Sequence, residues 1–343
     1  MHHCLALVRL THCLSVHCLA ELNGYRSVSV SMLSLMASAV RRAVKGQSMG
    51  KRDNKILSLV GVDLADADDS QLKDYFASTL KRGMHGIGFS AYEEGQKPGD
   101  DISLAQIKRR MTIIKPHFEW VRSFSCRQGN ELIPMVAKQM GLKTLVGAWL
   151  GESPEKNADE IARLIQLAQD GYVDIAAVGN EVMYRGDLTE DELLTHIYQV
   201  KEAVPNIPVG YVDAYYEFED RPAITAACDV ILANCYPFWE GCALEYSLLY
   251  MKDMYRRTIK VAAGKDVIIT ETGWPNKGQD FYGAKPSQEA AVRYFINAQQ
   301  WAQEEGIEMF YFSSFDEPWK VGAEGDVGAY WGLWDKDESL KYQ

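Results

Sequence analysis

The segment Val267–Gly278, "VIITETGWPNKG", joins a strand pattern to a chemical group that does not belong in a strand interior. Three consecutive β-branched residues, Val267, Ile268 and Ile269, predict a buried strand. The run ends at an acid, Glu271, and a Gly-Trp-Pro turn then stops the strand. Glu is a poor helix cap, which weakens a merely structural reason for this carboxylate. We therefore expect the strand to end at a functional site.

Seven more short runs of β-branched and aromatic residues predict further strands, and amphipathic segments lie between them. With residues 267–270, the predicted strands are 85–90, 120–125, 143–149, 173–179, 207–212, 230–235 and 309–314. The clearest helical patterns are residues 153–170, 189–203 and 287–305. Ser153 is expected to cap the first helix, and Thr189 with Glu192 forms a capping box for the second.

Eight strands that alternate with helices predict an α/β fold, a single (β/α)8 TIM barrel. The alternative is an open doubly wound sheet, whose nucleotide-binding form needs a glycine-rich first turn. The glycines near residues 83–95 are scattered and form no G-x-G-x-x-G motif before a helix. We favour the barrel and expect residues 49–343 to form one catalytic domain.

Residues 1–48 differ in kind from the rest of the chain. They hold four of the seven histidines, three of the seven cysteines and a single acid, Glu21. Their Cys and His spacing fits no familiar zinc pattern. The weakly apolar stretch Val28–Val40 resembles a signal peptide, yet it is rich in serine and starts far from residue 1. We expect a leader, disordered or processed, outside the fold, and no transmembrane span anywhere in the chain.

Charge and cysteine usage narrow the possible partners. The chain has 47 acidic against 36 basic residues, a net charge of −11, which argues against nucleic acid and permits a neutral substrate such as a sugar. The four cysteines after residue 48 lack framework spacing, so we expect free thiols; pairing of Cys235 with Cys242 is the alternative. Neither oligomeric state nor compartment follows from the sequence.

Active sites of such barrels lie at the carboxyl ends of the strands. The fourth predicted strand ends at Asn180 and Glu181, and the seventh ends at Glu271. Two carboxylates at a mouth lined with Trp and Tyr are the equipment of a glycosidase, since one must protonate the leaving oxygen and the other must attack or activate water. Taken alone, Glu181 is more often a solvated loop residue, and an acid such as Glu271 after a hydrophobic strand is often a helix cap. The combination of the two acids with aromatic and polar residues at other strand ends favours catalysis.

Five separated motifs in this order resemble glycoside hydrolase family 17, and its bacterial and fungal β-1,3-glucanase and β-1,3-glucanosyltransferase branch above all. They are "GNE" at 179–181, "NCYPFW" at 234–239, "TETGWP" at 270–275, "FDEPWK" at 315–320 and "GDVGAYWGLWDKD" at 325–337. The resemblance covers residues 83–342. It implies a clan A barrel that retains anomeric configuration and needs no metal or nucleotide cofactor.

The resemblance also implies roles for particular residues. Glu181 would be the acid/base and Glu271 the nucleophile of a double displacement. Asn180 would bind the sugar 2-OH, and Tyr236 would hydrogen-bond the nucleophile. Other substrate-binding candidates are the strand-eight pair Glu317 and Lys320, the strand-two Arg122, and the aromatic residues Trp149, Phe238, Trp274 and Trp319. For Arg122 a buried structural ion pair is the alternative, and for each aromatic residue it is core packing. Asp213 and Tyr215 would line a subsite.

The predicted substrate is β-1,3-glucan of the laminarin type, either hydrolysed or transferred to another sugar. The mechanism needs Glu181 protonated and Glu271 ionised. We expect Tyr236 and Arg122 to hold Glu271 ionised, while the negative neighbour and partial burial raise the pKa of Glu181. Alternatives are another clan A β-glycanase acting on β-1,4 links, and a barrel that binds polysaccharide without cleaving it.

Overall fold

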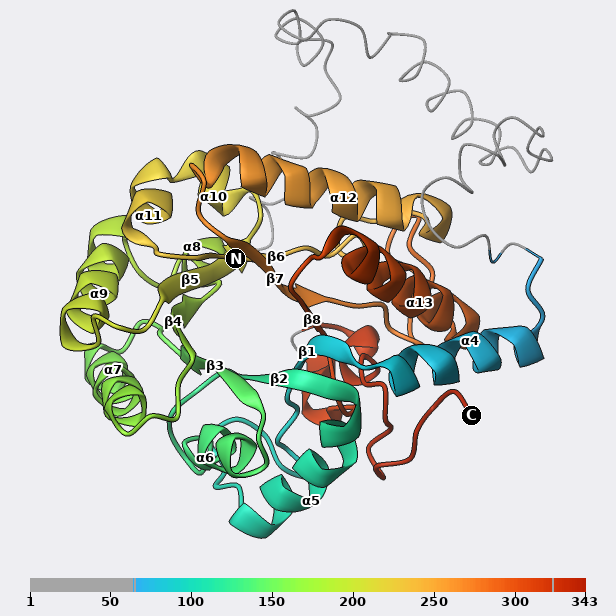
Figure 1. Cartoon of the computed structure of the whole chain (residues 1–343), viewed down its shortest axis with the longest axis horizontal. Coiled ribbons are helices and arrows are strands. Elements are labelled where there is room, and N and C mark those ends of the chain that lie inside the picture. The colour runs from blue at the N-terminus through green and yellow to red at the C-terminus, as the bar shows by residue number, and fades with distance from the viewer. Residues whose placement is uncertain (1–63, 65, 323) are drawn as a thin grey trace, which may run out of the picture. The chain divides into compact units, whose positions relative to one another are not determined.

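The computed structural model describes residues 64, 66–322 and 324–343; the predicted leader, residues 1–48, lies outside them. Eight parallel strands pair in chain order and β8 closes onto β1, which confirms the predicted TIM barrel (Figure 1). The strands are β1 (Met84–Gly88), β2 (Phe118–Ser123), β3 (Lys143–Ala148), β4 (Ile175–Asn180), β5 (Val209–Ala214), β6 (Ile231–Asn234), β7 (Val267–Thr272) and β8 (Met309–Tyr311).

Helices surround this barrel and connect each strand to the next (Figure 1). They are α4 (Asp69–Arg82), α5 (Leu104–Ile114), α6 (Leu132–Gln139), α7 (Pro154–Gln169), α8 (Val182–Arg185), α9 (Glu190–Ala203), α10 (Glu217–Asp220), α11 (Pro222–Ala227), α12 (Leu244–Val261) and α13 (Gln288–Glu305). Short 3-10 turns are η2 (Lys115–His117), η3 (Pro318–Gly322) and η4 (Asp326–Ala329).

The predicted helix starts are confirmed in detail. The Ser153 side chain accepts a hydrogen bond from the Lys156 amide at the start of α7. Thr189 and Glu192 form the capping box of α9, each side chain bonded to the other's backbone amide. These caps satisfy amides that a helix cannot satisfy itself, and so they fix where each helix begins.

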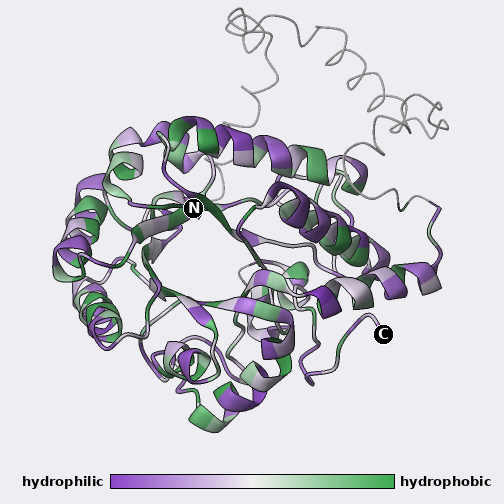
Figure 2. Cartoon of the chain, viewed as in Figure 1, coloured by the Kyte–Doolittle hydropathy of each residue, from purple (hydrophilic) through white to green (hydrophobic). Residues whose placement is uncertain are grey.

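The hydrophobic core has two parts. One lies between the strands and the surrounding helices. The other fills the barrel interior and consists of Trp120, Leu145, Ile175, Ala177, Val212, Val230, Leu232, Ile268 and Phe310. Figure 2 shows hydrophobic residues concentrated along the strands, while the helices carry both kinds of residue. Layered packing of this kind makes a barrel interior a core and not a channel.

Strand β7 carries a bulge at its carboxyl end, where its pairing with β6 and with β8 shifts register. Thr270 faces the barrel interior, since its hydroxyl donates to Asn234 at 2.9 Å. Thr272 faces outward, since its hydroxyl bonds that of Tyr294 on α13. Regular alternation from Thr270 would direct Glu271 outward and Thr272 inward, so the bulge is what places two consecutive side chains, Thr270 and Glu271, on the interior face.

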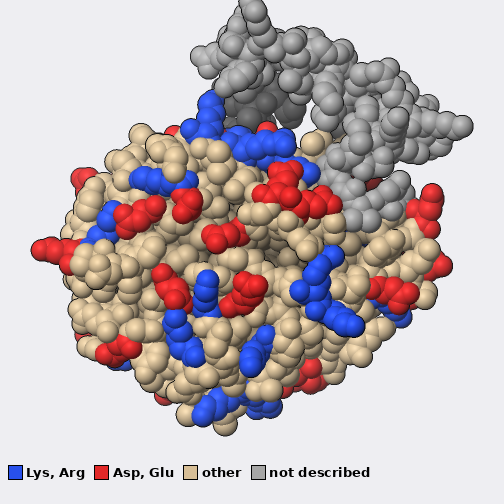
Figure 3. All heavy atoms as spheres, in the orientation of Figure 1, with Lys and Arg blue, Asp and Glu red and all other residues tan. Residues whose placement is uncertain are grey.

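The cysteines and the surface charges agree with an ordinary globular protein. Cys126, Cys228, Cys235 and Cys242 are free, as predicted. Acidic and basic side chains are interspersed across the face shown in Figure 3, with Lys and Arg along α12 bordered by acids. Within the described residues, no helix has both the length and the apolar character needed to cross a bilayer.

Candidate active site

The structure brings the two predicted catalytic acids to the same end of the barrel, at the carboxyl ends of β4 and β7. Of the two acids, Glu271 has more side-chain hydrogen-bond donors around its carboxylate. Its Oε1 accepts from Arg122 Nη1 at 2.5 Å, and its Oε2 accepts from the Tyr236 hydroxyl at 2.8 Å. Arg122 also donates to the Thr270 carbonyl at 3.0 Å and is only 2% exposed. Both carboxylate oxygens therefore have a fixed donor.

Asn180 is oriented by the same guanidinium. Arg122 Nη2 donates to Asn180 Oδ1 at 2.6 Å. Because a guanidinium only donates, the amide oxygen must face it, which leaves Asn180 Nδ2 as a donor toward the mouth. One buried cation thus sets the direction of both the carboxylate of Glu271 and the amide of Asn180.

The backbone of Glu181 adopts a conformation that glycine and asparagine residues adopt more readily than glutamate. Its φ and ψ are 52° and 32°, in the left-handed region. Gly179, two residues earlier, also has positive φ, at 88°, and a Cβ there would lie 2.8 Å from Val182 Cγ2. The strand thus needs glycine at this bend, and a glutamate in a left-handed turn is a sign of a functional constraint.

The Glu181 carboxyl faces the barrel interior, where Asn234 Nδ2 donates to its Oε1 at 2.9 Å. Burial, together with the negative charge of Glu271, raises the pKa of Glu181 to about 7, while the Asn234 hydrogen bond opposes the shift. The predicted direction of the pKa shift for Glu181 is therefore present in the structure. A carboxyl with this pKa is partly protonated near neutral pH.

The end of strand β8 contributes a second charged group, formed by Glu317 and Lys320. Their side chains pair at 2.9 Å and both are buried. Trp319 Nε1 donates to Glu317 at 3.3 Å, which joins one predicted sugar platform to this pair. Glu324, not anticipated from sequence, lies near them, and burial raises the pKa of its carboxyl while Lys320 lowers it.

The four aromatic candidates separate by exposure. Phe238 and Trp274 are 0% and 1% exposed and pack ring against ring at 5.3 Å. Neither offers a face to a sugar, so for these two the prediction of a platform is corrected to core packing. Trp149, 43% exposed at the end of β3, and the half-buried Trp319 keep an accessible ring.

Other residues at the strand ends also differ from expectation. Asp213 and Tyr215 are buried, at 0% and 5% exposure, so neither lines an open subsite as predicted. Asn234, the first residue of the "NCYPFW" motif, has no predicted role in the sequence analysis. Its position two residues after Leu232 and four after Val230, both inside the barrel, was the signal that its amide also faces inward.

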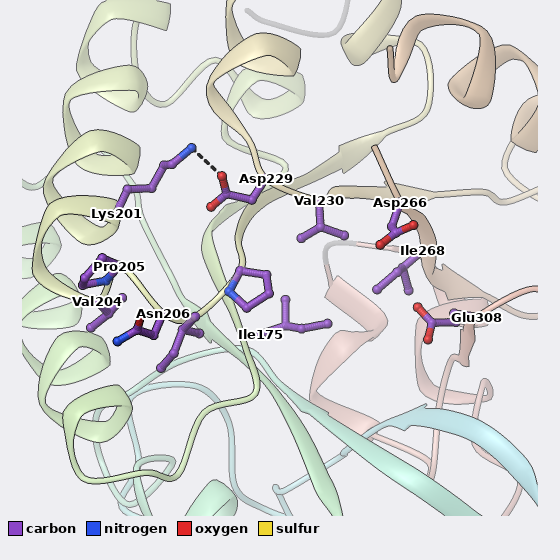
Figure 4. A pocket seen from close by; sticks show the side chains of 12 residues that line it. Ile175, Lys201, Val204, Pro205, Asn206, Asp229, Val230, Asp266, Ile268 and Glu308 are labelled. Atoms are coloured by element: carbon purple, nitrogen blue, oxygen red, sulfur yellow. Dashed lines mark ion pairs between the residues drawn. The ribbon is translucent and has the colours of Figure 1, made fainter. Parts of the chain in front are cut away.

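The opposite end of the barrel holds a pocket of about 570 Å³, at the amino ends of strands β4 to β8 (Figure 4). Ile175, Val230 and Ile268 form its apolar wall, and Lys201 pairs with Asp229 at its edge at 2.6 Å. None of the predicted site residues lies in this pocket. The predicted site residues lie at the carboxyl ends of the strands instead, where the active sites of TIM barrels are found.

Known proteins match this chain over most of its length. The family model described as the BtgE/BtgC glycoside hydrolase domain matches residues 86–332. A glucan 1,3-beta-glucosidase of Arthroderma benhamiae is 30% identical over 259 residues, 69% of this chain and 83% of that protein.

Two solved structures of a glycoside hydrolase family 17 β-1,3-glucanosyltransferase from Rhizomucor miehei are also similar. Each is 28% identical, covers 76% of this chain and 96% of the other, and has a TM-score of 0.68. One of them is an active-site mutant in complex with laminaritriose. With the closed barrel and the two inward-facing acids, these matches confirm the predicted family: the chain belongs to the BtgE/BtgC glycoside hydrolases of the family 17 β-1,3-glucanase branch.

Proposed function

We propose that this protein is a retaining β-1,3-glucan hydrolase or transglycosylase that uses Glu271 as nucleophile and Glu181 as acid/base. The observation that carries the proposal is the difference between the two acids. Glu271 has a donor on each oxygen, Arg122 and Tyr236, whereas burial raises the pKa of Glu181 to about 7. Two carboxyls with unlike surroundings are the arrangement that double displacement requires.

In the first step, a Glu271 oxygen attacks the anomeric carbon as the glycosidic C–O bond breaks. The proton of Glu181 passes to the departing oxygen, and a glucosyl ester forms on Glu271. In the second step, Glu181, now a carboxylate, takes a proton from water or from a sugar hydroxyl. The resulting oxygen nucleophile attacks the anomeric carbon, the ester bond breaks, and both acids return to their first state.

Neighbouring groups have supporting roles in this proposal. The free Nδ2 of Asn180 donates to the sugar 2-OH, where hydrogen bonding strengthens in the transition state. Trp149 and Trp319 stack on sugar rings, because their faces are accessible. Glu317 and Lys320 hydrogen-bond sugar hydroxyls near Glu271. The substrate class follows the similar proteins, named as a glucan 1,3-beta-glucosidase and a β-1,3-glucanosyltransferase.

Product analysis on β-1,3-linked glucose oligosaccharides of defined length tests the proposal. Proton NMR of the first products should show the β anomer, and longer products would report transfer. Glu271→Gln should lower the rate at least about 10⁴-fold. A 2-fluoro sugar should leave its ester on Glu271, visible by peptide mass spectrometry.

The matched control is Glu308→Gln, since Glu308 lies before β8 at the far end of the barrel and has a half-exposed side chain. Its rate should stay within twofold of the unmodified protein. Full activity of Glu271→Gln would refute the assigned nucleophile. Cleavage of β-1,4 but not β-1,3 oligosaccharides would show a different glycanase, and glucan binding without turnover at any pH would show a binding protein.

A further inference from the structure

Tyr211 and Asp213 form a buried polar pair that the proposed chemistry does not use. They lie on the outward-facing side of β5, since Val212 between them belongs to the barrel interior. Both are 0% exposed. The Tyr211 hydroxyl donates to Asp213 Oδ2, and the Ala214 amide donates to Oδ1 at 2.7 Å.

This pair lies against the first turn of α8, the short helix that begins immediately after Glu181. A residue at the N-cap normally lends its side chain to the amides of the first turn. Glu181 occupies that position, but its carboxyl is turned into the barrel toward Asn234, and no side-chain cap forms. The Met183 amide donates instead to the Tyr211 hydroxyl at 2.8 Å, and the Tyr184 amide donates to Asp213 at 3.3 Å.

Side chains of β5 therefore accept the hydrogen bonds of the first-turn amides of α8. The Glu181 carboxyl is not needed for capping and can face the barrel interior. Without those two acceptors, the amides of Met183 and Tyr184 would lose their hydrogen-bond partners. The left-handed conformation of Glu181, which is unfavourable for a residue other than glycine, would then have fewer contacts to hold it.

Asp213 also brings a charge close to Glu181. Burial raises the pKa of Asp213 to about 6, while the Tyr211 hydroxyl and the Ala214 amide oppose the shift, so a large fraction is ionised at neutral pH. The charged and titratable groups around Glu181 are Glu271 on β7, Asp213 on β5, Arg122 on β2, Tyr184 on α8 and Tyr236 just after β6. Around Asp213 they are Tyr211, Glu217, Glu181, Tyr184 and Tyr216.

We propose that Tyr211 and Asp213 are positioning residues that hold Glu181 in its left-handed turn and, through the charge of Asp213, favour its protonated form. The inference rests on the proposed acid/base role of Glu181. Neither residue contacts the mouth of the barrel, so they act through Glu181 and through the turn that carries it.

Asp213→Asn is the primary test, because it keeps the size of the side chain and an acceptor oxygen but removes the charge. The basic limb of kcat/KM, expected near pH 7 in the unmodified protein, should move to lower pH by roughly half a unit. The sign follows from electrostatics: with one negative neighbour fewer, Glu181 loses its proton at lower pH. At the optimum, kcat should fall about tenfold with KM within twofold.

Tyr211→Phe is the second variant, and it removes the acceptor of the Met183 amide while leaving Asp213 in place. Its kcat should fall severalfold with KM unchanged. A dinitrophenyl β-glucoside supplies a further readout, because its leaving group needs no protonation. Both variants should lose much less activity on this substrate than on the oligosaccharide.

Asp229→Asn is the matched control, since Asp229 also accepts from a backbone amide, that of Val209, but at the far end of β5. An equal shift of the basic limb in Asp229→Asn would overturn the proposal, as would an unmoved limb and unchanged kcat in Asp213→Asn. If Asp213→Asn does not fold, unchanged kcat in Tyr211→Phe overturns it. Full oligosaccharide activity in Glu181→Gln would instead refute the proposed function.

Discussion

The two halves of the barrel interior are built from the same strands and differ in almost everything else. On β2, Trp120 belongs to the apolar cluster, and Arg122, two residues further, binds Glu271. On β6, Leu232 is apolar and Asn234 binds Glu181. Each step of two residues keeps a side chain on the interior face but moves it from the packed half to the polar half.

Residues that stabilise the fold and residues proposed for catalysis thus lie on the same strands, in different halves of the barrel. The apolar half is packed from buried hydrophobic side chains, and their burial stabilises the fold. The polar half keeps buried charges that contribute little net stability, because desolvation offsets their attraction. Substitutions in the two halves should therefore have different signatures, and four variants probe that division in order of decreasing effect.

Arg122→Leu should have the largest effect, because it leaves the carboxylate of Glu271 buried without its cation. We expect a loss of about 3–5 kcal/mol in the free energy of unfolding and a fall of about 10²–10³ in kcat/KM. Urea denaturation and oligosaccharide hydrolysis measure the two. The double variant with Glu271→Gln should recover part of the stability; no recovery would mean that the pair is not coupled.

Leu232→Ala tests the apolar half, where we expect a loss of stability without a loss of kcat. The side chain is fully buried inside the barrel, so its truncation should cost about 3 kcal/mol in unfolding free energy. The kcat of the folded protein should stay within twofold. A large loss of kcat without a loss of stability would contradict the proposed division of the barrel.

Glu181→Gln should stabilise the protein at neutral and alkaline pH. The folded-state pKa of about 7 lies above the ordinary value of 4.5. The contribution of Glu181 to stability is thus fully present below about pH 4.5 and is lost as the pH rises through 7. Relative to the unmodified protein, the variant should gain up to about 3 kcal/mol by pH 8 and nothing at pH 4. Thermal unfolding across this range provides the measurement, and a pH-independent difference would refute it.

Trp149→Ala should have the smallest effect, confined to substrate affinity. Its ring is 43% exposed, with the Arg185 guanidinium 4.6 Å from the ring centroid. Loss of one stacking face should raise KM about three- to tenfold, with kcat within twofold. Tyr198→Ala, an exposed aromatic on α9, is the control, and an equal rise in KM there would argue against a platform at Trp149.

Sequence reasoning predicted the barrel well because its strands are short apolar runs with clear breaks. Prediction of β8 was less accurate: residues 309–314 were expected, and the strand ends at Tyr311. Residues 312–315 divide their backbone hydrogen bonds between two partners. The amides of Phe312 and Ser314 still bond to β7 and β1, whereas Ser313 and the Ser314 carbonyl pair with the chain at residues 331–334. Local composition does not reveal which partner a backbone segment will find.

The candidate site was predicted less evenly. Four residues that meet at the mouth could be named because they lie at or just after the carboxyl ends of predicted strands: Arg122, Asn180, Tyr236 and Glu271. Phe238 and Trp274 could not be told from sugar platforms, because an aromatic side chain suits a core as well as a groove. The support from Tyr211 and Asp213 could not be predicted, since it depends on a turn conformation at Glu181 that only coordinates reveal.

The bulge in β7 has a consequence for chain length. The position of Glu271 near the mouth, facing inward directly after Thr270, uses one residue more than regular pairing with β6 and β8 would use. Removing Thr270, with no acid changed, would restore regular alternation and leave Glu271 in the inward slot of Thr270, about 3.3 Å further from the mouth and out of register with Arg122 and Tyr236. A change in the number of residues along this strand is thus a separate route to an inactive barrel, one that a survey of substitutions would never sample.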